Sequence, residues 1–270
     1  VFVEAGAMYR ADGPADMRPV GQVEFVNGLA AMSASGRYGK TRHCAGIVGH
    51  ADLMLGDKVQ PVLEALIAAG NGRFRGIRHG LTWDTGNAAK FGRRQVPPQQ
   101  ALDPVFRRGF AHLKPLDLSF EAWLFHPQLP DLVDLLKAFP DTNIVMNHCG
   151  GLLGIAPHDG DRNEVFKIWH AHIRALAKFP NLSVKVGGLA MLYCNWDFHL
   201  RAMPPSSEDL AAAWEPYVDA CIEAFGPDRC MMESNFPVDK QSCGYGVLWN
   251  ALKRITANYS AADKAALYHD

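Results

Sequence analysis

Two histidines near the middle of the chain stand where neighbouring β-strands are expected to end. One is His126, in Phe125-His126-Pro127-Gln128, and the other is His148, in Asn147-His148-Cys149-Gly150-Gly151. A neutral imidazole can bind a metal ion, hold a substrate carbonyl, or move a proton near pH 7. The alternative for each is a structural histidine that is hydrogen-bonded at a strand end. We predict that both are catalytic residues.

Further polar side chains follow other apolar runs. Arg78 and His79 close the run that begins at Phe74, and a guanidinium there can hold a substrate carboxylate through two parallel hydrogen bonds. Tyr9 and Trp83 also lie at or after strand ends. We predict that these four residues bind substrate, with pairing or loop packing as the alternative.

The last apolar run is followed by Glu233-Ser234-Asn235-Phe236-Pro237-Val238-Asp239. Asn235 can orient a substrate or a water molecule, but an amide has no useful basicity. Asp239 could act as a general base if its loop returns to the cavity, and helix capping or pairing with Lys240 is the alternative. We therefore predict that Asn235 binds substrate and that Asp239 is catalytic.

The elements that must position these residues alternate along the chain. The β-rich runs are Val1–Ala5, Ala45–Gly49, Phe74–His79, Leu118–Leu124, Asn143–His148, Leu182–Gly187 and Cys230–Ser234. The helical patterns are Val23–Ser33, Val59–Ala69, Pro104–Leu113, Leu129–Phe139, Asn163–Phe179, Glu208–Phe225 and Tyr245–Ala257. This alternation favours an α/β fold with a parallel sheet, whose strand carboxyl ends carry the active site. Seven strands are one short of a (β/α)8 TIM barrel, so we predict a single domain over residues 1–270 whose first strand is missing from the sequence.

The alternation within these strands predicts a polar barrel interior. Glu4, Glu121, Lys185 and Glu233 fall on the face opposite their apolar neighbours. Charged groups inside a barrel must be paired. A structural ion-pair network is the first interpretation, and a catalytic role for one member is the alternative.

Composition excludes several classes of function. The 27 basic and 28 acidic residues give a net charge of −1, which offers no basis for binding nucleic acid or an anionic membrane surface. No apolar run approaches the roughly 18 residues that span a bilayer. The six cysteines are scattered without a C-x-x-C pair and are typical of reduced cytoplasmic thiols. We expect a cytoplasmic protein with a small-molecule substrate, and whether it forms a homo-oligomer stays open.

Four segments in order resemble the amidohydrolase-related TIM-barrel hydrolases. They are Phe74–Arg78, His126–Pro130, Phe139–Thr142 with Asn147–Gly151, and Glu233–Asp239. The resemblance is greatest to the group that contains 2-pyrone-4,6-dicarboxylate lactonase and the sugar-lactone lactonases. It implies a (β/α)8 fold and, in that group, hydrolysis without a bound metal. It also implies that His148 matches a strand-six histidine that polarises the scissile carbonyl.

The chain departs from the family pattern at two points. The family carries a His-x-His motif on its first strand, and none stands at this N-terminus, so we infer that this strand is missing. The family also carries a water-activating aspartate on strand eight, where this chain has Asn235. Asp239, or a histidine of the missing strand, would have to supply the base.

We predict a metal-independent hydrolase of a small carboxylated lactone or related cyclic ester, with no cofactor. Asn235 is a poor ligand at a site that needs anionic or imidazole donors. One alternative is a hydrolase or decarboxylase with one Zn or Mn ion on the same barrel. Another is a catalytically inactive ligand-binding barrel, which the asparagine also suggests.

Overall fold

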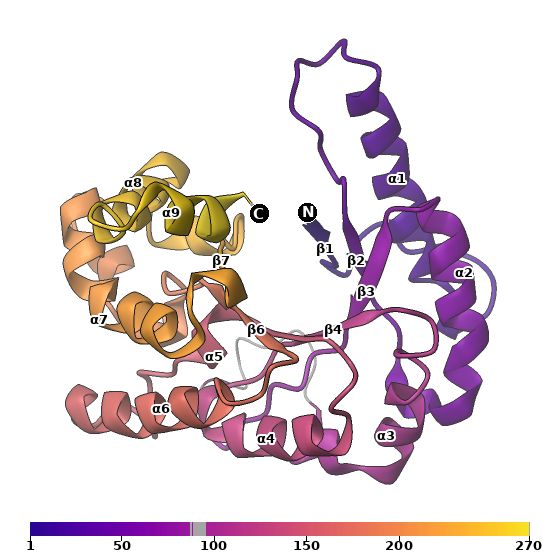
Figure 1. The fold of residues 1–270 in the computed structure, drawn as a ribbon, viewed down its shortest axis with the longest axis horizontal. Helices are drawn as coiled ribbons and strands as arrows, with labels where there is room; N and C mark the ends of the chain where they lie inside the picture. Colours follow the sequence, from indigo (N-terminus) through magenta and orange to yellow (C-terminus); the bar gives the residue numbers. More distant parts are fainter. Residues whose placement is uncertain (87, 89–95, 270) are drawn as a thin grey trace. The chain divides into compact units, whose positions relative to one another are not determined.

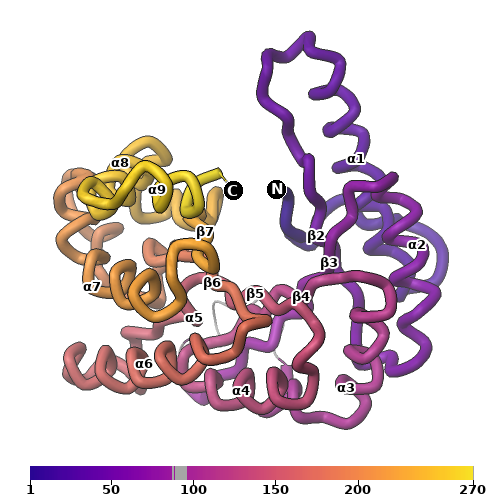
Figure 2. The backbone as a smooth tube through the Cα atoms, viewed as in Figure 1, coloured from indigo at the N-terminus to yellow at the C-terminus, as the bar shows by residue number. Residues whose placement is uncertain are grey.

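A computed structural model describes residues 1–86, 88 and 96–269 of the chain. Strands and helices alternate along it (Figure 1), and the backbone tube in Figure 2 follows the same order. The described strands are β1 (Phe2–Val3), β2 (Ile47–Gly49), β3 (Phe74–Arg78), β4 (Ser119–Ala122), β5 (Ile144–Met146), β6 (Leu182–Val186) and β7 (Cys230–Met232). The described α-helices are α1 (Val20–Ala34), α2 (Gln60–Gly70), α3 (Pro104–Phe110), α4 (Leu129–Ala138), α5 (His148–Gly151), α6 (Arg162–Leu176), α7 (Ser207–Phe225), α8 (Tyr245–Ile255) and α9 (Ala261–Tyr268).

The strand order in the sheet is the chain order, from β1 to β7. The strand pairs β1–β2, β2–β3, β3–β4 and β6–β7 are all parallel. A parallel sheet with strands in sequential order and helical crossovers is the topology of a TIM barrel. The predicted α/β class is therefore confirmed.

The chain divides into two compact units. Unit 1 comprises Val1–Gly80, Gln99–Ala122 and Phe139–Ile144. Its core holds an aromatic cluster in which the rings of Phe110 and Phe120 lie 5.0 Å apart and both side chains are fully buried. Strand β3 needs a glycine at Gly76, because an added Cβ atom would stand 2.2 Å from the Ser119 hydroxyl.

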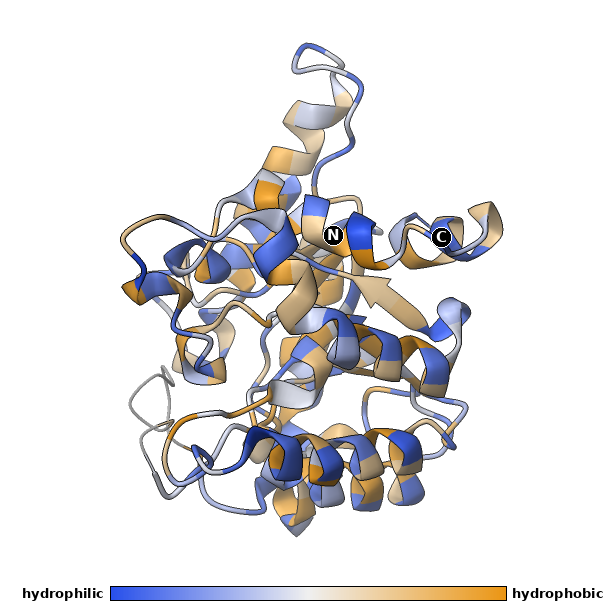
Figure 3. Cartoon of the chain, turned by 90° about the vertical axis from the view of Figure 1, so that its left-hand side faces the viewer, coloured by the Kyte–Doolittle hydropathy of each residue, from blue (hydrophilic) through white to orange (hydrophobic). Residues whose placement is uncertain are grey.

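Unit 2 comprises Leu81–Pro98, Trp123–Ala138 and Val145–Asp270. In β6 the alternate residues Leu182, Val184 and Val186 are fully buried, whereas Ser183 and Lys185 are half-buried. The predicted two-sided alternation of this strand is thus confirmed. Figure 3 shows hydrophobic and hydrophilic residues on the same helices, as expected for helices that cover a sheet.

The seven predicted strands and seven predicted helices are all present, with ends that differ by a few residues. The prediction omitted the short turn α5 and helix α9, which begins at a capping box between Ser260 and Asp263. Residues 87 and 89–95, which follow the predicted substrate residue Trp83 along the chain, lie outside the described residues. Among the described residues, no helix is long and apolar enough to cross a membrane.

Candidate active site

The segment that follows β5 is a single left-handed turn. His148, Cys149, Gly150 and Gly151 all have positive φ, at 54°, 51°, 74° and 66°. Left-handed backbone costs a non-glycine residue roughly 1–2 kcal/mol, and such conformations cluster at functional sites. An added Cβ atom on Gly151 would lie 2.0 Å from the Leu124 carbonyl oxygen, so this turn packs directly on the backbone beyond β4. The turn fixes the direction in which the His148 ring projects.

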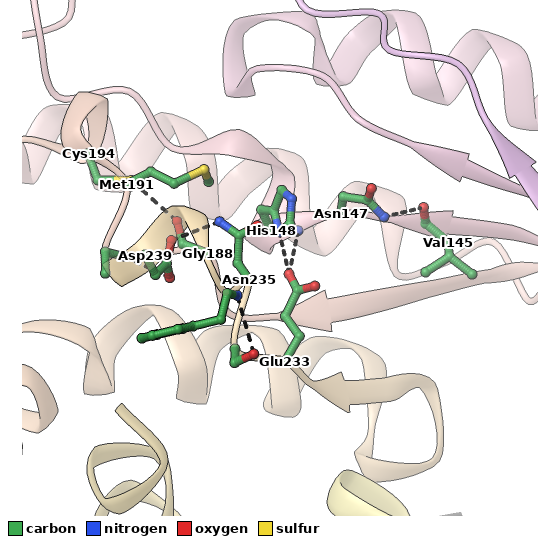
Figure 4. Close-up of polar contacts among 12 residues, drawn as sticks. Val145, Asn147, His148, Gly188, Met191, Cys194, Glu233, Asn235 and Asp239 are labelled. Carbon is green, nitrogen blue, oxygen red and sulfur yellow. Dashed lines mark hydrogen bonds and ion pairs between the residues drawn. The ribbon is translucent and has the colours of Figure 1, made fainter. Parts of the chain in front are cut away.

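The His148 ring is hydrogen-bonded to a carboxylate from the end of β7. Its Nδ1 lies 2.5 Å from Oε1 of Glu233, and the same oxygen accepts the His148 backbone N–H at 3.2 Å (Figure 4). A carboxylate on Nδ1 holds a histidine in the tautomer whose Nε2 lone pair is free. Among the described residues, His148 Nε2 has no hydrogen-bond partner. The pair is thus built like a general base with its orienting carboxylate.

Two glycines after β6 allow this close approach. A Cβ atom on Gly187 would stand 2.4 Å from the Glu233 carbonyl oxygen, and one on Gly188 would stand 2.7 Å from His148 Cγ. Gly188 also has a positive φ of 66°. A side chain at either position would displace the histidine or its carboxylate.

We expect Gly188→Ala to lower kcat/KM by on the order of 10²-fold, because a misplacement of about 1 Å costs that much in a positioned site. Gly226→Ala is the matched control, since Gly226 also has a positive φ but nothing lies within 4 Å of its added Cβ atom. Thermal unfolding should show that both variants remain folded. Wild-type activity in folded Gly188→Ala would contradict this placement of His148.

Asn235 and Asp239 form a second polar pair beside the first (Figure 4). Asn235 Nδ2 donates to Asp239 Oδ1 at 2.8 Å, and the Ala190 N–H donates weakly to Oδ2 at 3.4 Å. Asp239 is fully buried in the short 3-10 helix Val238–Gln241. Burial raises the pKa of the Asp239 carboxyl to about 8, and the negative charge of Glu233 adds to the effect. The Asp239 carboxyl thus fixes the Asn235 side chain through a hydrogen bond. The predicted role of Asp239 as the catalytic base stays a prediction.

The raised pKa of Asp239 predicts a pH-dependent stability. An unfolded aspartate has its ordinary pKa near 3.9, so between about pH 4 and about pH 8 the Asp239 carboxyl holds a proton in the folded chain that it has lost in the unfolded chain. The contribution of Asp239 to the free energy of unfolding should fall with rising pH in this window, by up to about 1.4 kcal/mol per pH unit. Asp239→Asn removes this contribution, so urea unfolding from pH 5 to pH 8 should show the stability of the variant, relative to wild type, rising with pH. Parallel profiles for the two proteins would contradict the assignment.

His126 lies in the 3-10 helix His126–Gln128, where its Nδ1 accepts the Leu153 N–H at 3.1 Å. Burial lowers the pKa of His126 to about 4, and the neighbouring His158 and His172 contribute further. The ring is therefore neutral near pH 7 and secures a loop backbone through Nδ1. Only Nε2 remains for chemistry, and the predicted catalytic role of His126 stays a prediction.

Trp83 lies in a segment held by one buried carboxamide. Gln128 Oε1 accepts the N–H groups of Trp83 and Phe125, at 2.9 and 3.1 Å, and Gln128 Nε2 donates to the Leu81 carbonyl at 2.7 Å. The next residue, Asp84, pairs with His158 Nε2 at 3.0 Å. The Trp83 side chain keeps 37% of its surface exposed, so it remains available as the predicted substrate contact.

Three predicted substrate-binding residues, Arg78, His79 and Tyr9, belong to unit 1. Arg78 Nε donates to Glu4 Oε1 at 2.9 Å, and its Nη2 donates to the Glu4 carbonyl. His79 is buried, and its Nδ1 accepts the Leu53 N–H at 3.1 Å. Tyr9 is exposed. Their roles in substrate binding stay predictions.

The sequence pattern did not identify Glu233 as the partner of His148. The expectation that interior charges are paired is confirmed for Glu233 with His148 and for Glu4 with Arg78. The available signal was the position of Glu233 on the inner face at the end of β7. A carboxylate and an imidazole at strand ends of one sheet can meet, but their separation of 85 residues hides the pairing from any local pattern.

The side chains of His148, Glu233 and Asp239 in unit 2 do not by themselves form a metal-binding site. A catalytic zinc site needs three protein ligands. His148 offers one open nitrogen, one Glu233 oxygen already accepts two hydrogen bonds, and the Asp239 carboxyl binds its proton up to about pH 8. Within the described residues, no group of three His, Cys, Asp or Glu could hold an ion.

The chain is similar to proteins of one family over nearly its whole length. Residues 2–270 match the family model described as amidohydrolase. A protein of Sinorhizobium fredii (strain NBRC 101917 / NGR234), named uncharacterized protein y4mH, is 33% identical over 252 residues, 93% of this chain and 73% of that protein. L-fucono-1,5-lactonase of Burkholderia multivorans (strain ATCC 17616 / 249) is 30% identical over 226 residues, 83% of this chain and 68% of that enzyme.

A solved structure gives a similar result. The crystal structure of an amidohydrolase from Burkholderia multivorans with bound zinc superposes with a TM-score of 0.67 at 28% sequence identity. The match covers 91% of this chain and 75% of that one.

Proposed function

The chain belongs to the amidohydrolase family, and we propose that it hydrolyses a small lactone without using a metal ion. The hydrogen bond between His148 Nδ1 and Glu233 Oε1 is the observation that carries the proposal. This hydrogen bond supports His148 as the general base. The sequence alone left the base unassigned, because Asn235 stands where a basic aspartate was expected. The lactonase name of the relative from Burkholderia multivorans supports the choice of substrate class.

In the proposed reaction, His148 Nε2 accepts a proton from a water molecule, which attacks the lactone carbonyl carbon. Glu233 stabilises the imidazolium that forms, as in other carboxylate-oriented histidine bases. The tetrahedral intermediate then collapses, and the bond between the carbonyl carbon and the ring oxygen breaks. The departing alkoxide takes the proton back from Nε2. The product is an open hydroxy acid, and the histidine returns to its neutral form.

The intermediate carries a negative oxygen that needs a hydrogen-bond donor. One N–H of the Asn235 carboxamide donates to Asp239, which leaves the second N–H of the same group for the substrate. In Figure 4 Asn235 lies between Asp239 and the His148–Glu233 pair. An asparagine can serve as an oxyanion donor but not as a base, so this role suits the residue that replaces the expected aspartate.

A carboxylated substrate remains part of the proposal, as the resemblance to the 2-pyrone-4,6-dicarboxylate lactonase group implies. A panel of five- and six-membered lactones, with and without a carboxyl group, tests both the reaction and this preference. Ring opening is followed by proton release at constant pH. We expect turnover of at least one lactone and a lower KM for its carboxylated counterpart.

A different outcome would identify the inactive alternative. If no lactone in the panel is opened while thermal shift detects binding of the same compounds, the chain is a ligand-binding barrel. A preference for uncarboxylated lactones would remove the carboxyl group from the proposed substrate but leave the hydrolysis proposal standing.

A further inference from the structure

We propose that Trp123 is the platform on which the ring of the substrate stacks, and that it selects cyclic esters over open-chain esters. This inference rests on the proposed function, because it assigns specificity to the site around His148. Trp123 is the first residue of unit 2 beyond β4, at the carboxyl end where substrate contacts are expected.

The indole of Trp123 lies directly against the proposed base. The ring centroids of Trp123 and His148 are 4.7 Å apart, and the two planes stand at 78°. A substrate carbonyl within reach of a water molecule on His148 Nε2 would therefore bring its ring beside the indole. No other aromatic ring among the described residues is recorded in contact with His148.

Two buried aromatic rings pack against the Trp123 indole. Phe125 lies 5.7 Å away and Tyr193 lies 6.3 Å away, and both side chains are buried. The Trp123 backbone carbonyl also accepts the Leu81 N–H at 2.7 Å. A side chain whose orientation is fixed by packing loses little entropy when a ligand binds.

Part of the Trp123 surface remains exposed, because the residue is only half-buried although His148, Phe125 and Tyr193 beside it are buried. Buried indole N–H groups usually find a hydrogen-bond partner. In the described part of the chain, the Trp123 Nε1–H has no hydrogen-bond partner. The Nε1 atom is not buried, so its N–H is accessible to a ligand. An open aromatic surface with a free donor at its edge suits a ring that carries polar substituents.

The test compares Trp123→Phe and Trp123→Leu with wild type on two esters of five carbons, cyclic δ-valerolactone and open-chain ethyl propanoate. Trp249→Phe is the matched control, because Trp249 lies in α8 and contacts Tyr245 of the same helix and Tyr268 of α9. Loss of a stacking contact should raise KM for the lactone about tenfold in Trp123→Leu and less in Trp123→Phe, with kcat nearly unchanged. The open-chain ester should be hydrolysed equally by all four proteins.

Binding of cyclohexanone, a ring with no ester bond to break, separates this inference from the reaction itself. Calorimetry should show weaker binding in Trp123→Leu than in wild type even if neither protein turns over lactones. If cyclohexanone binding and the lactone KM are both unchanged in Trp123→Leu, Trp123 is not a stacking platform for the substrate. Equal losses of kcat on both esters would also overturn it, because Trp123 would then only support His148.

Discussion

The variant His148→Asn is expected to lose lactone hydrolysis by on the order of 10³-fold in kcat, since it removes the general base. Asparagine is the substitution of choice because His148 has a φ of 54° and asparagine tolerates left-handed backbone better than alanine. The carboxamide cannot accept the proton of the attacking water. Steady-state kinetics on the lactone that wild type opens best would measure the loss.

The control for this variant is His199→Asn, which changes an exposed histidine in the same unit. It should keep wild-type kcat and KM. Circular dichroism and thermal unfolding of both variants would establish that the fold is intact. Wild-type kcat in folded His148→Asn would exclude His148 as the base.

The second large effect is expected for Glu233→Gln, which should lower kcat by on the order of 10²-fold with little change in KM. Glutamine keeps the size of the side chain and can still accept the N–H of His148. It lacks the charge that stabilises the imidazolium, and its amide can rotate to favour the wrong tautomer. The effect should appear in kcat because the charge acts mainly when the histidine is protonated.

A double-mutant cycle distinguishes a working pair from two independent residues. If His148 and Glu233 act together, the double variant should be hardly slower than His148→Asn alone. If the kcat losses of the two single variants multiply in the double variant, Glu233 contributes to catalysis independently of His148. Full activity in Glu233→Gln would reduce Glu233 to a structural partner.

The repeating elements of this fold could be predicted because each carries its own local pattern. Apolar residues at every second position predicted β6, and the same residues are fully buried. The predicted helical pattern Val59–Ala69 stops one residue before the end of α2 at Gly70, and Asn71 follows with the left-handed backbone of a helix end. These signals lie within a few residues of the feature that they predict.

The candidate site was predicted less completely because its geometry depends on residues far apart in the chain. The position of His148 at a strand end was visible, but its partner comes from the last strand. His126 follows the preceding strand with an equally suggestive motif, yet its Nδ1 bonds the Leu153 backbone. The difference between the two histidines arises from packing of loops whose conformations no periodic pattern encodes. Glycines such as Gly188 acquire their role only from the ring that packs against them.

We propose that His148, oriented by Glu233, opens a lactone without a metal ion. The most direct measurement is the rate of lactone opening by chelator-treated protein whose metal content is verified as substoichiometric by elemental analysis. We predict the same kcat as for untreated protein, no increase on addition of Zn or Mn, and loss of turnover in His148→Asn under the same conditions. Activity that disappears with the metal and returns only when Zn or Mn is restored would show that hydrolysis depends on a metal ion and would overturn the metal-independent role of His148.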